Sequence, residues 1–263
     1  MKIKTTSVVL CSLILLVGCK TGGTRSGEDG YSPKQSPETY INTPAYINVQ
    51  LGIGYMREGD FNLALARLKK ALTQNPDLAI GHGTIAVLYE ELGEFELSEK
   101  HYRKAIRLDY NNSSLHNNYG QYLCKHSDPR KAIEQFEIAA GNPLYKNTQI
   151  PLTNAGACAL RIPDPALAEE YLRRALEYNP RFPPALASMI QISADNEKYL
   201  QGRAYLQRYR EVAKHTADTL WNGYKIEKNL GDRDAAGNYA VRLKSRFPDS
   251  VQTKLLLDEI AER

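Results

Sequence analysis

Apolar and small residues recur from Pro44 onward with a period of about 34 residues. This period is typical of a helix–turn–helix unit, because large and small side chains return to the same places in both helices. The first unit carries Leu51, Gly52, Tyr55, Ala64, Leu68, Ala71 and Pro76 at these places. The pattern predicts helical hairpins over about 45–78, 79–112, 113–146, 149–182, 183–216 and 217–250, followed by a last helix over 251–263.

Packing explains why the pattern needs these residue types. Small residues such as Gly52 and Ala64 let the two helices of one hairpin approach closely, and large residues fill the space between hairpins. Gly59, Gly93 and Gly231 fall at turns between helices, where glycine permits a positive φ. Proline ends the second helix at 76, 180 and 248, because it cannot fit within a helix interior.

These residues resemble the tetratricopeptide (TPR) pattern. The resemblance implies an all-α fold, a TPR superhelical solenoid of about six helix-turn-helix repeats with a C-terminal capping helix. One hairpin cannot bury its apolar face alone, but a stack of hairpins can. The last two repeats match less well, since Tyr209 stands where a small residue is expected. We expect residues 251–263 to cap the stack with a polar outer face.

The first residues resemble a secretory signal peptide. Two lysines precede an apolar run over residues 7–17, which is too short to span a bilayer as a helix. The run ends in Leu16-Val17-Gly18-Cys19, which resembles the lipobox of bacterial lipoproteins. This resemblance implies that residues 1–18 are removed and that Cys19 becomes the lipidated first residue. The alternatives are a plain signal peptide with an incidental cysteine and a short buried helix.

The residues after Cys19 suggest a location. An Asp after the lipidated cysteine tends to retain lipoproteins in the inner membrane, whereas this chain has Lys20. The resemblance therefore implies a lipid-anchored protein on the periplasmic face of the outer membrane. Residues 19–43 are rich in Gly, Ser, Pro and charged residues, and they predict a flexible tether. No later apolar run is long enough for a transmembrane helix.

Charge and aromatic content favour protein partners. The chain of 263 residues has a formal net charge of +4, and two of these charges come from lysines in the predicted leader. Such a balance argues against a nucleic-acid binder, which usually shows a clustered basic face. The 17 Tyr residues, against 5 Phe and 1 Trp, suit helix packing and protein interfaces.

No motif in the chain is typical of catalysis or of a cofactor site. Gly52-Ile53-Gly54 is not a dinucleotide-binding loop, because it lies within a predicted helix and follows no strand. Cys124-Lys125-His126 brings two metal-ligating types together, but two adjacent ligands do not make a tetrahedral site. We therefore predict a protein that is not an enzyme and that uses no cofactor, metal or small-molecule substrate.

Two of the four cysteines suggest a disulfide. Cys11 leaves with the predicted leader and Cys19 takes the lipid, so Cys124 and Cys158 remain in an oxidising compartment. They fall on the first helices of the third and fourth hairpins, which pack about 8–10 Å apart. Cysteines at such a seam can reach the Cα separation of about 5.5–6 Å that a disulfide needs. The alternative is two free buried thiols.

The first helices of TPR stacks line a groove, and this groove is the candidate protein-binding site. The expected groove residues are Tyr46, Val49, Ile53 and Met56 in the first hairpin, Ile80, Gly83, Val87 and Glu90 in the second, and Ser114, Asn117, Gln121 and Cys124 in the third. The groove is thus expected to be apolar at its N-terminal end and polar in the middle, and exposed apolar surface usually marks an interaction site. The alternatives are that the tether covers these residues, or that the assigned register is shifted by one residue.

The arrangement as a whole is similar to the PilF/PilW family of type IV pilus biogenesis lipoproteins. The segments that carry the resemblance are residues 116–124, residues 154–158 and residues 165–180, and the cysteine pair is its most specific element. The family implies a pilotin, which binds a PilQ-like secretin subunit and promotes its outer-membrane localisation and multimerisation. The other classes to weigh are a TPR lipoprotein scaffold for peptidoglycan enzymes and a component of outer-membrane protein assembly.

Overall fold

The computed structural model describes residues 41–261, so the predicted leader, Cys19 and most of the predicted tether lie outside the described residues. The described part of the chain is helical and contains no strand, which confirms the all-α class. The helices are α2 (Pro44–Glu58), α3 (Phe61–Gln74), α4 (Ala79–Glu91), α5 (Phe95–Leu108), α6 (Ser113–His126), α7 (Pro129–Gly141), α8 (Gln149–Ala159), α9 (Pro165–Tyr178), α10 (Pro183–Asp195), α11 (Tyr199–Val212), α12 (Ala217–Asn229), α13 (Arg233–Arg246) and α14 (Val251–Ala261).

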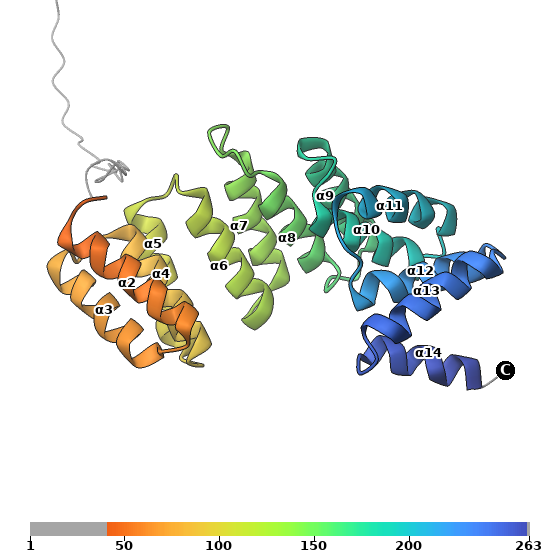
Figure 1. Cartoon of the computed structure of the whole chain (residues 1–263). Coiled ribbons are helices and arrows are strands. Elements are labelled where there is room, and N and C mark those ends of the chain that lie inside the picture. Colours follow the sequence, from red (N-terminus) through yellow and green to blue (C-terminus); the bar gives the residue numbers. More distant parts are fainter. Residues whose placement is uncertain (1–40, 262–263) are drawn as a thin grey trace, which may run out of the picture. The chain divides into compact units, whose positions relative to one another are not determined.

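Consecutive helices pair into hairpins, from α2 with α3 to α12 with α13, and each hairpin packs against the next one along the chain (Figure 1). The first helices of neighbouring hairpins also contact each other, as α2 with α4 and α4 with α6 do. The array is therefore held together mainly by contacts between sequence neighbours, as expected for stacked repeats. Among the described residues, no helix combines the length and the apolar character needed to cross a membrane.

Glycines set the close approach of the two helices within a hairpin. A Cβ added at Gly52 of α2 would lie 2.7 Å from Cγ of Leu68 in α3. Gly120 of α6 stands in the same relation to Phe136 of α7, whose ring carbon Cε1 would lie 2.7 Å away. Any side chain at these positions would push the helices apart, so the small residues are required by packing.

The turns between helices follow the predicted backbone. Gly59, Gly93 and Gly231 have φ values of 78°, 77° and 79°, in the left-handed region that glycine adopts without steric cost. Glu197 has a φ of 58° at the corresponding turn of the fifth hairpin. The geometry of the turn is therefore kept there even though the residue is not glycine.

Two expectations about the ends of the array were wrong. Leu51 was expected to fill space between hairpins, but it is 42% exposed. The reason is that no hairpin among the described residues precedes α2. Ile85, at the same place in α4, is only 1% exposed. The outer face of α14 was expected to be polar. Leu256 of α14 is buried in a cluster of the last hairpin, but Val251 and Leu255 are exposed.

In the sixth hairpin Gly231, Ala236 and Leu243 hold their predicted places, but the glycine at the close approach is displaced by one residue. A Cβ at Gly223 would lie 2.6 Å from the ring of Tyr239, so Gly223 rather than Tyr224 marks the close approach of α12 and α13. In the fifth hairpin, Tyr209 is buried although a small residue was expected, and its hydroxyl donates to the carbonyl oxygen of Lys214 at 3.3 Å. The polar tip of Tyr209 is therefore satisfied by the chain that follows α11.

Candidate protein-binding site

A cavity of about 560 Å³ opens on the first helices of the first three hairpins. We call it the first-helix groove. Its apolar lining residues are Ile53, Met56, Phe61, Ile80, Val87 and Leu115. Ile53, Met56, Ile80 and Val87 are half-buried, so each is held by the hairpins beneath it and still presents carbon surface to solvent. An apolar cavity of this size is large enough to take side chains of a bound peptide.

Polar and charged side chains form the rest of the lining. They are Arg57, Thr84, Glu91, Asn112, Ser114 and Asn118, together with the backbone at Gly83. Arg57 and Glu91 are exposed near the ends of α2 and α4, whereas Ser114 and Asn118 come from α6. The groove is thus mainly apolar over α2 and α4, with Arg57 and Glu91 near the ends of these helices, and mainly polar over α6 apart from Leu115, and this combination suits an amphipathic peptide.

Gly83 determines the floor of the groove. A Cβ added at Gly83 would lie 2.4 Å from Cδ2 of Leu115 in α6, so Leu115 occupies the space that a side chain on α4 would fill. The absence of a side chain at Gly83 therefore lets Leu115 of α6 reach the surface of α4, so residues of both helices line the groove.

Ile53, Met56, Ile80 and Val87 line the groove as predicted. The prediction for Val49 was wrong. Val49 is 0% exposed and lies in the buried cluster that includes Leu68 and Ile85. This place on the first helix faces the next hairpin rather than solvent, as the burial of Asn117 at the same place in α6 also shows.

Tyr46 was also predicted to line the groove, but it does not do so. It lies in the first turn of α2, where its backbone N–H donates to Oγ1 of Thr43 at 3.2 Å. Asn117 is buried, and its Oδ1 accepts from Nδ2 of Asn154 at 2.9 Å. Glu90 contacts the Lys125 ammonium at 3.1 Å instead of facing the groove. Gln121 does not line the groove either.

Several lining residues were missed by sequence reasoning. Phe61 begins the second helix α3, and the prediction considered first helices only. Thr84, Glu91 and Asn118 lie next to the predicted positions around their helices. A wider stripe of each helix, of the width that amphipathic helices normally present, would have included them.

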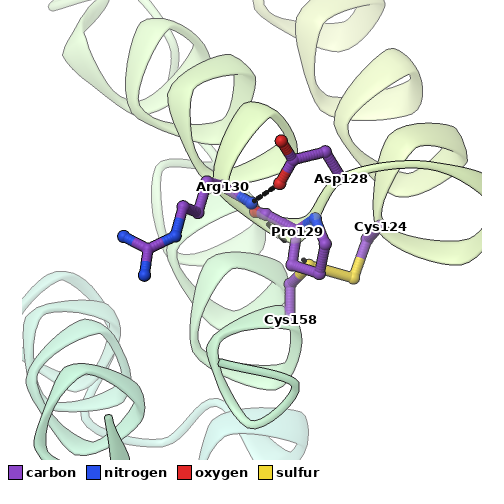
Figure 2. Close-up of a disulfide and its surroundings, with 5 residues drawn as sticks. All are labelled: Cys124, Asp128, Pro129, Arg130 and Cys158. Carbon is purple, nitrogen blue, oxygen red and sulfur yellow. Dashed lines mark hydrogen bonds between the residues drawn. A yellow bond between two sulfur atoms is a disulfide. The ribbon is translucent and has the colours of Figure 1, made fainter. Parts of the chain in front are cut away.

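The structure contains a disulfide between Cys124 of α6 and Cys158 of α8, with a Cα–Cα distance of 5.9 Å (Figure 2). It lies beside the start of α7, where the Asp128 carboxylate accepts from the backbone N–H of Arg130 at 2.8 Å. Cys124 therefore belongs to a covalent link between neighbouring hairpins, and it does not line the first-helix groove.

The described residues hold no group of three or more His, Cys, Asp or Glu side chains placed to bind a metal ion. In Cys124-Lys125-His126 both candidate ligands have other partners, since Cys124 forms the disulfide and Nε2 of His126 lies 3.2 Å from Glu90. His82 and His101 lie side by side with their Nδ1 atoms 2.8 Å apart, so one ring nitrogen of each histidine is engaged by the other histidine. The geometry of the groove is suited to binding a protein segment.

Comparison with known proteins identifies close relatives. The family model of the tetratricopeptide repeat matches residues 49–113. The type IV pilus assembly protein PilF of Pseudomonas aeruginosa is 29% identical over 252 residues, which cover 94% of this chain and 95% of that protein. The solved structure of P. aeruginosa PilF covers 82% of this chain and 97% of its own, with a TM-score of 0.73.

PilW, a widely conserved type IV pilus biogenesis factor, is 30% identical in its crystal structure. That structure superposes with a TM-score of 0.74 and covers 82% of this chain and 99% of PilW. The chain belongs to the PilF/PilW family. Members of this family are TPR scaffold proteins of type IV pilus biogenesis, which generally bind proteins and do not catalyse reactions. The first-helix groove is therefore the candidate site for a protein partner of pilus biogenesis.

Proposed function

We propose that this protein is a non-enzymatic pilotin, anchored by lipid to the periplasmic face of the outer membrane. It binds the secretin subunit of the type IV pilus system and promotes outer-membrane localisation and multimerisation of that subunit. Loss of the protein is therefore expected to abolish pilus biogenesis and twitching motility. Family membership supports the pilus system, and the first-helix groove supports a peptide-binding mode of action.

The half-buried apolar stripe of the groove is the observation that carries this proposal. Ile53 and Met56 of α2 face the same cavity as Ile80 and Val87 of α4, so two helices present one continuous apolar surface. A partner segment that buries this surface gains the hydrophobic free energy without requiring the hairpins to unfold. The rigid backing of the side chains also reduces the entropy that binding costs.

The proposed location at the outer membrane depends on Cys19 and Lys20, which lie outside the described residues. A lipid at Cys19 holds the protein at a membrane, and the first described helix begins at Pro44. The residues between them supply the chain length that separates the groove from the anchor. Lipid anchor and groove together describe a carrier that brings a secretin subunit to the membrane in which it assembles.

The test replaces apolar lining residues with a charge. Ile53→Asp and Val87→Asp place a carboxylate in the groove, and the double variant should weaken secretin binding at least about tenfold, as for central apolar contacts in other interfaces. The measurement is a crosslinked pull-down of the secretin from membranes, together with the amount of secretin multimer on a denaturing gel. The matched control is Leu200→Asp, which changes a leucine of α11 that is 73% exposed and lies outside the groove.

The outcomes separate the proposed function from its alternatives. Wild-type binding by the double variant, with helicity preserved, would exclude the groove as the secretin site. Deletion of the protein with normal piliation but altered cell shape or septation would instead favour a scaffold for peptidoglycan enzymes. A general loss of outer-membrane proteins would favour a role in their assembly.

A further inference from the structure

A second cavity, of about 520 Å³, lies between the second helices of the last two hairpins. We call it the arginine cavity. Its polar lining comes from one stripe of α11 and one stripe of α13, which carry Arg203, Gln207 and Arg210 and then Asn238, Tyr239 and Arg242. On α11 these residues are four and three positions apart, and on α13 Arg242 lies four and three positions after Asn238 and Tyr239, so each set lies on one side of its helix. The cavity does not involve any helix of the first-helix groove.

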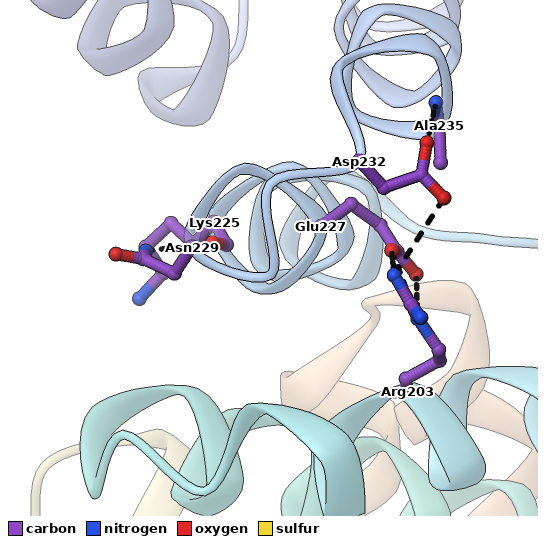
Figure 3. A network of polar contacts seen from close by, with 6 residues as sticks. All are labelled: Arg203, Lys225, Glu227, Asn229, Asp232 and Ala235. Carbon is purple, nitrogen blue, oxygen red and sulfur yellow. Dashed lines mark hydrogen bonds and ion pairs between the residues drawn. The ribbon is translucent and has the colours of Figure 1, made fainter.

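One of the three arginines is neutralised within the chain. The Arg203 guanidinium donates from Nε to both carboxylate oxygens of Glu227, at 3.1 and 3.0 Å, and lies 3.6 Å from Asp232 (Figure 3). Arg210 and Arg242 form no ion pair within residues 41–261. Both acidic residues of the cavity contact Arg203, and the lining as a whole, with three arginines and two carboxylates, keeps a net positive charge.

The surroundings of His215 confirm that positive charge is concentrated here. His215 is buried and packs edge-on against Tyr239, with ring centroids 5.6 Å apart. Burial is the main cause that lowers the pKa of His215 to about 4, and the charges of Arg242, Arg210 and Arg246 act in the same direction. The neutral imidazole adds no charge of its own, so the positive potential of the cavity comes from the guanidinium groups.

The lining also indicates which kind of anion fits. A guanidinium matches the two oxygens of a carboxylate, and carboxylates are its usual partners in proteins. Gln207 and Asn238 are exposed at the cavity, and their amides offer a bound segment both donors and acceptors. A peptide supplies both through its carbonyl and N–H groups, whereas a phosphate offers oxygen acceptors.

We propose that the arginine cavity binds an acidic segment of a partner protein, with carboxylates on Arg210 and Arg242 and the peptide backbone on Gln207 and Asn238. This site is independent of the proposed secretin groove. It gives the chain a second docking point, on the second helices of the stack and at its C-terminal end.

The experiment uses the purified mature protein and a fluorescently labelled peptide rich in Asp and Glu. Fluorescence anisotropy in about 20 mM salt, where charge interactions are weakly screened, reports binding. The double variant Arg210→Gln, Arg242→Gln should bind at least about tenfold more weakly, because charged hydrogen bonds are lost. The matched control is Arg233→Gln, which removes an exposed arginine of α13 that does not line the cavity. Circular dichroism verifies that all variants keep their helices.

Three further probes decide the chemistry. An isosteric peptide with Asn and Gln in place of the acids should not bind, inorganic phosphate should compete poorly, and vesicles containing about 30% anionic phosphatidylglycerol should not bind through these arginines. Strong binding of phosphate or vesicles without binding of the acidic peptide would overturn the proposal in favour of a phosphate or lipid site. An equal loss in Arg233→Gln would overturn it in favour of general attraction to a basic surface.

Discussion

At the residue scale, His82 and His101 form a hydrogen-bonded pair within the second hairpin. Their Nδ1 atoms are 2.8 Å apart, and Nε2 of His82 lies 2.9 Å from the carbonyl oxygen of Pro76. His82 therefore donates through Nε2 and accepts through Nδ1 from His101, and protonation of His82 would remove this acceptor. Burial lowers the pKa of His82. The pKa of His101 is lowered to about 4, mainly by burial and in addition by the charge of His82.

We expect this pair to make the protein less stable in mild acid. Unfolded histidines, with a pKa of about 6.5, bind protons that the folded pair excludes. The contribution of the pair to the free energy of unfolding is therefore complete above about pH 6.5, and it decreases as the pH falls towards about 4. His101→Gln should keep a donor for His82, because the third hairpin places Gln135 beside His116 in the same way, with its Oε1 2.8 Å from Nδ1, and the amide Nε2 of a glutamine can donate to Nδ1 of His82. Between about pH 7 and pH 5 the variant should lose about 1 kcal/mol less than the wild type, after allowance for the half-exposed ring.

Urea unfolding of both proteins at the two pH values measures this difference. His215, whose pKa is also lowered to about 4, is present in both proteins and contributes equally. The difference between the two proteins therefore isolates the pair at His82 and His101. Parallel loss of stability in wild type and variant would show that protonation of this pair does not control stability.

At the element scale, the two halves of the array bury different residues at one place in the first helix. The first three hairpins carry Asn48, His82 and His116 there, whereas the last three carry Leu152, Leu186 and Leu220. The polar residues are hydrogen-bonded, as in Asn48, whose Nδ2 donates to Oε1 of Gln74 at 3.0 Å. Hydrogen bonds constrain direction as well as distance, so the hairpins that line the first-helix groove are held in a defined geometry.

The disulfide joins α6 and α8, which are otherwise held by packing and by the hydrogen bond between Asn117 and Asn154. Cys124 and Cys158 are separated by 34 positions in the chain, and their link closes a loop across the third and fourth hairpins. In the chain-entropy model such a link stabilises the fold by about 3–4 kcal/mol, because it restricts the unfolded chain. Cys124→Ala with Cys158→Ala should lower the free energy of unfolding by about that amount in urea titrations.

A reducing agent provides the control for this prediction. Dithiothreitol should lower the stability of the wild type to near that of the double alanine variant, and it should leave the variant unchanged. If the wild type is equally stable with and without the reductant, the link does not stabilise the fold.

At the scale of the whole molecule, the two candidate sites lie on different parts of the array. The first-helix groove belongs to the first three hairpins, and the arginine cavity belongs to the last two. Stacked repeats transmit contacts only between neighbours, so each site is supported by its own hairpins. The two proposals together predict that the chain holds two protein segments at once, an amphipathic segment in the first-helix groove and an acidic segment in the arginine cavity.

The proposed anchor gives a prediction at this scale. Cys19→Ala should prevent lipidation, release the protein into the soluble periplasmic fraction and reduce secretin multimers. The purified variant should still bind the secretin, because the groove lies in residues that the substitution does not touch. Metabolic labelling with palmitate and separation of inner and outer membranes on a density gradient measure the two effects.

A second variant tests whether the residue after Cys19 determines which membrane holds the protein. Lys20→Asp should keep the lipid but retain the protein in the inner membrane, so secretin multimers should fall while palmitate labelling stays normal. Outer-membrane location of Lys20→Asp, or membrane attachment of Cys19→Ala, would contradict the proposed anchor.

Local sequence was sufficient to predict the hairpins, because every repeat places Gly, Ala and large apolar residues at the same places. Gly52 against Leu68 and Gly120 against Phe136 show that these residues do set the packing distance. Such contacts lie within one hairpin, so their partners can be assigned by counting along the chain. The same counting indicated the cysteine pair and most of the apolar groove.

The tertiary structure determined the features that the repeat pattern along the chain could not predict. Val49 and Ile53 are one helical turn apart, but the next hairpin covers only Val49, and Leu51 is exposed because of its place in the array rather than its type. Arg210 and Arg242 come together because α11 packs beside the last hairpin. Periodicity determines which residues a helix turns inward, because it is a property of the backbone. Burial and charge at a given residue depend on which neighbours are present, and only the stacked array supplies them.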